Sequence, residues 1–352
     1  MTPTTTTPTA DPGATPTTTR QVVLAARPQG EPTPQDFRVE TAELPELGEG
    51  DLLVRTSVMS VDPYMRGRMD DRESYVAPFE VDGPLDGGAV GEVVASRSDD
   101  VAVGQTVLHG LGWREHAVVP ASRVSVVDPD AAPASAYLGV LGMPGLTAYA
   151  GLTAVAEMRE GDVVFVSGAA GAVGSAVGQI AKALGASRVI GSAGSADKVA
   201  RLSELGFDEA FSYRDAPVRE SLATAAPDGI DVYFDNVGGD HLEAAIGALR
   251  LHGRVAMCGA IAQYNATGPT PGPGNLALAI GKNLTLRGFI VGRYEHLAGE
   301  YRERAARWLA DGTLQADETV RDGLDAAPQA LIDLLGGANT GKMLVRLQPP
   351  GV

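Results

Sequence analysis

Three evenly spaced glycines, Gly168, Gly171 and Gly174, could bring the main chain close to a phosphate group. A continuous apolar run at 163–166 precedes them, as expected for a parallel strand buried on both faces. A helical pattern follows, and the free amides at its start could bind an anion. The spacing is GxxGxxG rather than GxGxxG, so the triplet alone is weak evidence for nucleotide binding. The strand before it and the helix after it supply the support. We predict a dinucleotide pyrophosphate site here.

The end of the next strand pattern, 188–193, indicates which dinucleotide binds. An NAD site carries Asp or Glu there, to accept a hydrogen bond from the ribose 2′-hydroxyl. In this chain Gly194 follows the strand, and no carboxylate precedes Asp197. Lys198 and Arg201 follow as counter-charges for a 2′-phosphate, although Lys198 could instead be a solvated residue in the first turn of a helix. The pattern favours NADP(H).

The surrounding elements must position this site. Six apolar strand patterns separated by crossover segments predict an α/β fold with a doubly wound, six-stranded parallel sheet. They lie at 163–166, 188–193, 209–213, 231–236, 253–259 and 284–291. Before them, short strands with many Gly and Pro residues predict a β-rich domain of about the first 140 residues. A last strand pattern at 341–347 is expected to return to that domain.

Composition limits the classes of function. The 352 residues are 44% hydrophobic, enough for two domains. A net charge of -16 argues against nucleic-acid or anionic membrane partners. One cysteine, Cys258, excludes an internal disulfide and multi-cysteine zinc sites, and the five histidines show no metal-ligand spacing, so no metal is expected. Residues 1–19 lack the features of a signal peptide and predict a disordered Thr/Pro-rich tail on a cytoplasmic protein.

Seven segments in order carry a resemblance over about 21–349. They are SVDPYMRGRM (60–69), LGMPGLTAYAGL (141–152), GAAGAVGSAVGQIAKALG (168–185), GSADKVARLSELGFDEAFSY (194–213), DVYFDNVGGDHLEAAIGAL (231–249), CGAIAQYNATGP (258–269) and GANTGKMLV (337–345). The chain resembles the zinc-free medium-chain dehydrogenase/reductase superfamily, and within it the prostaglandin reductase, alkenal double-bond reductase and curcumin reductase group. The resemblance implies a GroES-like substrate domain over 20–145 and 325–352, a Rossmann domain over 146–324, and a homodimer that pairs the edge strand 284–291.

The resemblance also implies which residues contact NADP(H). Pyrophosphate contacts fall in the glycine loop, 2′-phosphate contacts follow the second strand, nicotinamide contacts follow the fifth and sixth strands, and one contact comes from the C-terminal segment. These residues are Ala170, Gly171, Ala172, Val173 and Gly174; Gly194, Lys198 and Tyr213; Asn236; Cys258, Gly259, Ala260, Ile261 and Tyr264; Phe289, Ile290 and Val291; and Asn339.

The activity implied by the resemblance is reduction of a C=C bond conjugated to a carbonyl. The carbonyl oxygen needs a hydrogen-bond donor while enolate charge develops, and the α-carbon needs a proton. Tyr264, in the loop after the fifth strand, is the first candidate donor, although it could simply pack its ring and bond locally. A cofactor ribose hydroxyl is a second donor, and water could deliver the proton. Tyr64 is expected to contact substrate, or else to belong to a structural turn with Asp62 and Arg66.

Three functions therefore compete. The first is an NADPH-dependent ene-reductase acting on small α,β-unsaturated ketones and aldehydes, which the DPYMRGR segment and the YNxTGP pattern after the fifth strand favour. The second is a zinc-free NADPH quinone reductase with the same fold. The third is an NADPH-binding protein without turnover, acting as a structural or regulatory partner.

Overall fold

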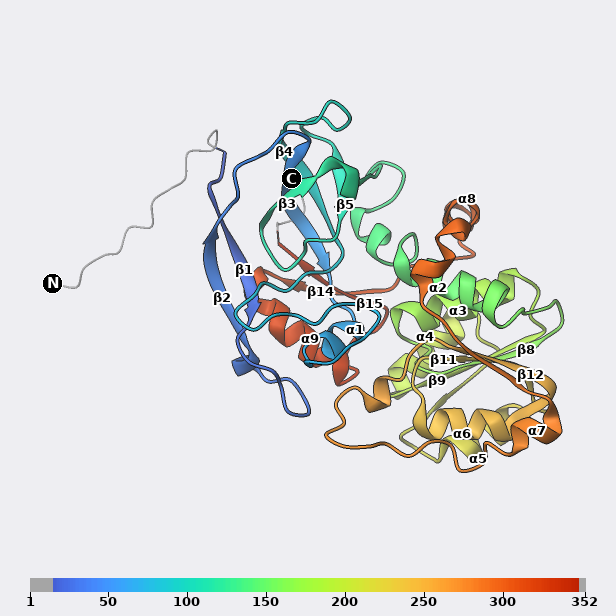
Figure 1. Ribbon diagram of the computed structural model, residues 1–352. Helices are drawn as coiled ribbons and strands as arrows, with labels where there is room; N and C mark the ends of the chain where they lie inside the picture. Colours follow the sequence, from blue (N-terminus) through green and yellow to red (C-terminus); the bar gives the residue numbers. More distant parts are fainter. Residues whose placement is uncertain (1–14, 348–352) are drawn as a thin grey trace.

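The computed structural model describes residues 15–347, folded around two large sheets that lie side by side, with a third sheet of two strands (Figure 1). The expected disordered tail, residues 1–19, lies outside the described residues as far as position 14. Thr18 and Thr19 already belong to the first strand. Among the described residues, no helix has the length and hydropathy needed to cross a bilayer.

The six-stranded sheet is parallel throughout and confirms the predicted doubly wound fold. Its strand order is β10-β9-β8-β11-β12-β13. The strands are β8 (Val163–Val166), β9 (Arg188–Ala193), β10 (Glu209–Ser212), β11 (Ile230–Asp235), β12 (Leu249–Met257) and β13 (Thr285–Gly288). The strand predicted at 284–291 is shorter than expected, because Ile290 leads into a 3₁₀ segment that begins at Val291.

Helices cover both faces of this sheet, which explains the continuous apolar runs. Val164 and Val166 pack into one core cluster, whereas Phe165 between them packs into another. The first cluster is closed by α2 (Met143–Ala150), α3 (Ala172–Ala183), α4 (Ala196–Glu204) and α8 (Ala298–Ala310). The second is closed by α5 (Val218–Ala225) and α6 (Gly239–Ala248), while α7 (Leu278–Lys282) contacts β12.

The second sheet has seven strands and confirms that the C-terminal segment returns to the first part of the chain. Strand β15 (Lys342–Arg346) lies between β14 (Glu318–Asp322) and β3 (Asp51–Ser60). The sheet continues through β4 (Ala89–Ser96), β5 (Thr106–His109) and β7 (Ser125–Val126), while β6 (His116–Pro120) pairs with β3. A hairpin of β1 (Thr18–Leu24) and β2 (Phe37–Glu43), with α1 (Tyr64–Arg68) and α9 (Ala327–Leu335), packs beside it (Figure 1).

Gly341 joins the two units at the start of β15. Its φ of +66° lies in the left-handed region, and an added Cβ would lie 1.9 Å from the carbonyl oxygen of Asp317. Only glycine fits such a position without displacing the main chain. The Gly341 amide donates to the carbonyl oxygen of Ala170 at 2.7 Å, so the returning strand fixes the predicted glycine loop.

Candidate active site

A cavity of about 1270 Å³ lies between the two units. One wall includes residues that follow parallel strands by one or two positions, namely Gly168 after β8, Gly194 after β9, Asn236 after β11 and Cys258 after β12. The opposite wall comes from the loop and helix around Tyr64. Ligands of doubly wound sheets bind beyond the carboxyl ends of the strands, and the cavity occupies that position. Its volume exceeds the range typical of a site for one small ligand, about 300–1,000 Å³.

The glycine loop turns tightly before α3. Gly168 has a φ of +58°, and a Cβ on Gly174 would lie 2.4 Å from the Gly168 carbonyl oxygen. The helix begins at Ala172 with Gly171 as its N-cap, so the first amides of α3 lack intrahelical partners. Because Gly168, Gly171 and Ala172 all line the cavity, these amides fit an anionic group there.

The cavity end beside β9 carries positive charge. Lys198 is half-buried, and its Nζ donates to the Gly337 carbonyl oxygen at 2.8 Å. Burial lowers the pKa of Lys198, and the nearby charge of Arg214 lowers it further. Neither cation forms an ion pair with another described residue, and both line the cavity. Two neighbouring cations that pair with no described carboxylate fit a phosphate group.

Two further residues shape this end. A Cβ on Gly194 would lie 2.7 Å from the hydroxyl oxygen of Tyr213, so glycine leaves that hydroxyl accessible. The Tyr213 ring packs edge-on against His241 at 5.3 Å between centroids. Arg201, the second counter-charge considered from the sequence, is engaged elsewhere, since its guanidinium pairs with Asp317 at 2.8 Å and with Glu204.

A buried hydrogen-bond network holds the turn after β11. The Asp235 carboxylate accepts from the Tyr233 hydroxyl at 2.7 Å and from the amides of Val237 and Gly238 at 3.0 and 2.8 Å. Burial nevertheless raises the pKa of Asp235. The Asn236 side-chain amide donates to the Ser167 carbonyl oxygen at 2.8 Å, which fixes Asn236 at the cavity edge.

Tyrosine hydroxyls gather at the other end of the cavity. The Tyr264 hydroxyl accepts a hydrogen bond from the Ala260 amide at 3.5 Å, and burial raises the pKa of Tyr264, with smaller effects from Tyr75 and Cys258. Burial likewise raises the pKa of Tyr64, and the charge of Asp62 adds to this effect. Burial raises the pKa of Cys258 to about 12. These hydroxyls and the thiol are therefore neutral near pH 7.

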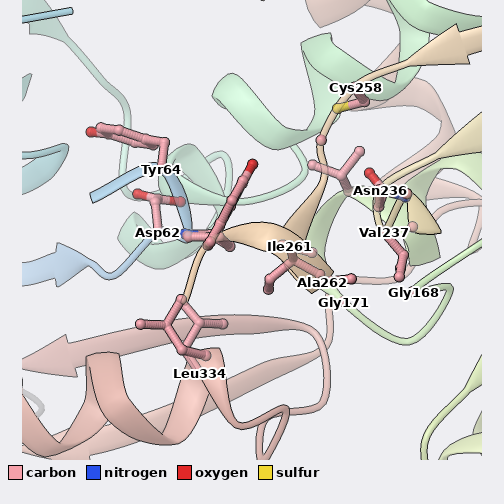
Figure 2. A pocket seen from close by; sticks show the side chains of 18 of the residues that line it. Asp62, Tyr64, Gly168, Gly171, Asn236, Val237, Cys258, Ile261, Ala262 and Leu334 are labelled. Carbon is pink, nitrogen blue, oxygen red and sulfur yellow. The ribbon is translucent and has the colours of Figure 1, made fainter. Parts of the chain in front are cut away.

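One buried and one partly exposed ion pair stabilise the wall that carries Tyr64. Lys342, which is 3% exposed, donates from Nζ to Asp62 at 3.0 Å and to two carbonyl oxygens. The guanidinium of Arg68 binds both carboxylate oxygens of Asp86 and stacks on the Phe79 ring at 3.9 Å. Figure 2 shows Tyr64 and Asp62 across the cavity from Gly168 and Gly171.

The structure brings together nearly all the site residues predicted from the sequence. The exception is Ala260, which does not line the cavity but donates its amide to Tyr264. Those that line it are Tyr64, Ala170, Gly171, Ala172, Val173, Gly174, Gly194, Lys198, Tyr213, Asn236, Cys258, Gly259, Ile261, Tyr264, Phe289, Ile290, Val291 and Asn339.

Sequence reasoning missed several lining residues. Arg214 follows Tyr213 directly, so its position beside a predicted phosphate contact was a usable signal. Tyr75 lies in a long loop, and Arg68 meets Asp86 only through tertiary packing, so neither had a sequence signal.

Within residues 15–347, no group of three or more His, Cys, Asp or Glu side chains is arranged to hold a metal ion. The cavity residues described here therefore offer main-chain amides, cations and hydroxyls rather than a set of metal ligands.

Comparisons with known proteins agree with this architecture. A family model described as N-terminal domain of oxidoreductase matches residues 20–127, and one described as zinc-binding dehydrogenase matches 172–311. The NADPH-dependent curcumin reductase of Escherichia coli is 40% identical over 334 residues, covering 93% of this chain and 96% of that protein. The NADP(+)-dependent 2-alkenal reductase of Nicotiana tabacum is 41% identical over 334 residues, with 93% and 96% covered.

A solved structure is equally similar. The crystal structure of CurA from Vibrio vulnificus in complex with NADPH superposes with a TM-score of 0.89 at 41% identity, covering 94% of this chain and 100% of that one. Fold and site together define a two-unit nucleotide-dependent oxidoreductase. The chain belongs to the zinc-free medium-chain dehydrogenase/reductase superfamily, in the group of prostaglandin, alkenal double-bond and curcumin reductases, which confirms the resemblance seen in its sequence.

Proposed function

We propose that this protein is an NADPH-dependent ene-reductase that reduces the C=C bond of α,β-unsaturated ketones and aldehydes. The observation that carries the proposal is the continuity of one cavity, with cations that pair with no described carboxylate at one end and neutral hydroxyls at the other. Relatives named curcumin reductase and 2-alkenal reductase, and a similar structure solved with NADPH, support it.

NADP(H) binding follows from the residues along this cavity. When bound, NADPH supplies the hydride that reduces the β-carbon of the substrate. The amides at the start of α3 bind the pyrophosphate, while Lys198, Tyr213 and Arg214 bind the 2′-phosphate. Asn236 and Asn339 line the middle of the site, and the lining residues after the fifth and sixth strands would hold the nicotinamide half, namely Cys258, Gly259, Ile261, Tyr264 and 289–291.

Tyr264 stabilises the developing enolate. Its hydroxyl oxygen already accepts from the Ala260 amide, so its own proton is free for the substrate carbonyl oxygen. Because burial raises the pKa of Tyr264, the hydroxyl remains protonated and donates without changing charge. Tyr64 contacts the substrate from the opposite wall, and water protonates the α-carbon, which completes the addition of two hydrogens across the double bond.

Steady-state NADPH oxidation tests this function against its competitors. We expect turnover with an enone and an enal, with a saturated ketone as the product of the enone and a saturated aldehyde as the product of the enal. Faster turnover of a quinone than of any enone would support the quinone reductase instead. Tight NADPH binding without oxidation in the presence of any of these compounds would support a non-catalytic role.

The charge of Lys198 should determine coenzyme preference. Lys198→Gln removes a charged hydrogen bond to the 2′-phosphate, which contributes about 1.5–3 kcal/mol, so NADPH affinity should fall about 10- to 100-fold. The affinity for NADH should change little. Fluorescence titration with both coenzymes measures the ratio. Lys182→Gln is the matched control, since Lys182 pairs with Asp208 on the surface of α3. An unchanged NADPH/NADH ratio in Lys198→Gln would contradict the assignment.

We also propose that the protein is a cytoplasmic homodimer. Strand β13 is an edge strand of the six-stranded sheet, with one side unpaired. Exposed apolar side chains lie nearby on and before α7, including Leu276, Leu278 and Ile280. Unprotected edges of this kind favour pairing with another chain.

A further inference from the structure

We infer that the buried charge of Asp235 favours the oxidised, positively charged nicotinamide over the reduced, neutral one, and so favours hydride donation within the site. This inference rests on the proposed function, because it needs the nicotinamide to lie beside Cys258 and Gly259. It follows from the position of a buried carboxylate that no cation neutralises among the described residues.

Three aspartates are buried in the part of the chain that the structure describes, and two of them form ion pairs. Asp62 pairs with Lys342, and Asp162 pairs with Arg254. Asp235, which is 1% exposed, pairs with no cation in the same part of the chain. A buried carboxylate without a counter-charge costs free energy, and such groups cluster at functional sites.

Hydrogen bonds stabilise the charged form of this carboxylate. Four neutral donors converge on its Oδ1, namely the hydroxyls of Tyr233 and Ser167 and the amides of Val237 and Gly238. Burial raises the pKa of Asp235, and these four hydrogen bonds oppose the rise. Because the donors are neutral, they stabilise the negative charge without cancelling it.

Asp235 lies behind the cavity wall that the nicotinamide would contact. Its carbonyl oxygen accepts from the amides of Cys258 and Gly259 at 2.9 and 3.0 Å, and both residues line the cavity. Figure 2 shows Asn236, the next residue along the chain, on the same side of the cavity as Cys258. Burial is the main cause of the raised pKa of Cys258 and of Tyr264, and the charge of Asp235 adds to both. The field of Asp235 therefore reaches this part of the cavity.

The other charged groups along the cavity do not cancel this field. The cations are either held in ion pairs on the opposite wall or lie at the adenosine end, namely Arg68 and Lys342, and Lys198 and Arg214. The lining carboxylates outside ion pairs are exposed, so water and salt screen their charges, and they are Glu31, Asp240 and Glu243.

Hydride transfer changes the charge beside this wall. Two electrons and a proton pass from the neutral dihydronicotinamide ring to the β-carbon of the enone, which leaves the ring with one positive charge. The enolate then takes a proton from water at its α-carbon, and the solvent buffers the hydroxide. The product is neutral, so the ring alone keeps a new charge. A fixed, buried negative charge stabilises that positive ring more than the neutral one.

Binding of NADP+ and of NADPH, measured by isothermal titration calorimetry at pH 8 without any enone, tests this inference. In Asp235→Asn the ratio Kd(NADP+)/Kd(NADPH) should rise at least about threefold, because only the oxidised form loses an attraction. The fold should be kept, since an amide oxygen can accept from the same four donors and the second oxygen of Asp235 accepts from no described residue. Asp235→Ser is a second neutral variant, whose hydroxyl can accept from the Val237 and Gly238 amides, and it should shift the ratio in the same direction.

Two control variants separate the charge of Asp235 from the shape of the site. Tyr233→Phe disturbs the same network but keeps the carboxylate, and Asp240→Asn removes an exposed carboxylate from the cavity lining. Each should change the ratio by less than about twofold. An unchanged ratio in both neutral variants of Asp235, or an equal rise in either control, overturns the inference while the ene-reductase function stands. If the unmodified protein binds neither form of the coenzyme, the proposed function itself fails.

Discussion

At the scale of single residues, burial raises the pKa of the tyrosine donors in the cavity and keeps their hydroxyls neutral. Tyr264 is the clearest case, since its raised pKa extends the pH range over which the hydroxyl keeps its proton. A donor that stays neutral can stabilise an oxyanion without a compensating charge nearby. The hydrogen bond from the Ala260 amide partly offsets the rise in pKa, and it leaves the Tyr264 proton free to be donated.

Tyr264→Phe should lower kcat/KM for an enone about 10- to 100-fold, because one donor to the developing oxyanion is lost while a cofactor hydroxyl remains. NADPH affinity should stay within about twofold, since the ring is retained. The fall in rate above pH 10 expected from ionisation of Tyr264 should be absent in the variant. Tyr137→Phe, which removes a surface hydroxyl bonded to the Asp128 carbonyl oxygen, is the control. Equal rates for Tyr264→Phe and the unmodified protein would exclude the donor role.

His241 should limit stability in acid. Burial lowers its pKa from 6.5 to about 4, and its Nε2 has no hydrogen-bond partner among the described residues. The pKa of His241 is lower in the folded state than in the unfolded state, so protonation favours unfolding. The free energy of unfolding therefore has its full value above pH 6.5 and decreases as pH falls towards 4. His241→Phe keeps the ring against Tyr213 and should gain about 1–3 kcal/mol of unfolding free energy at pH 4.5 relative to pH 8.

Urea unfolding at both pH values measures this difference. His109, whose pKa burial also lowers to about 4, should maintain part of the acid sensitivity in the variant. His296→Phe, at an exposed position, provides the control. A pH dependence identical to that of the unmodified protein would contradict the role of His241.

At the scale of elements, the sequence predicts buried strands well and exposed ones poorly. Strand β8 was recognisable because both of its faces pack against helices, so its residues are all apolar. Strand β14 was not predicted, since Glu318–Asp322 is largely charged and only Val320 packs on a core. The glycine loop had a local signal, whereas the Arg68–Asp86 pair depends on tertiary contacts that no local pattern encodes.

Gly341→Ala should disrupt the junction between the returning strand and the glycine loop. The left-handed φ and the 1.9 Å approach of an added Cβ to the Asp317 oxygen predict a loss of at least about 3 kcal/mol in unfolding free energy. NADPH affinity should fall as well, because the Gly341 amide holds Ala170. Gly323→Ala has a similar φ of +84° with no atom within 4 Å of the added Cβ, and should cost only about 1 kcal/mol. Equal losses in the two variants would refute the steric argument.

At the scale of the whole molecule, the exposed edge predicts self-association. Ile280→Asp places a charge on a side chain that is 81% exposed near β13, and should weaken the proposed dimer by about tenfold or more in dissociation constant. Light scattering during gel filtration distinguishes one from two copies. Val103→Asp, at a side chain 61% exposed in the other unit, should leave the mass unchanged. A monomeric unmodified protein, or a dimer that survives Ile280→Asp, would contradict this surface as the interface.

The return of β15 to the first unit also sets an order of events during synthesis. Lys342 lies 280 positions from its partner Asp62, and the parallel sheet is encoded entirely between them. On a ribosome the nucleotide-binding unit can therefore fold first, while the edge of β3 that pairs with β15 is still without its partner strand. Translation that stalls after residue 312 should release a chain whose nucleotide-binding unit is folded. Its first unit lacks β14 and β15, so we expect that unit to aggregate or to bind chaperones.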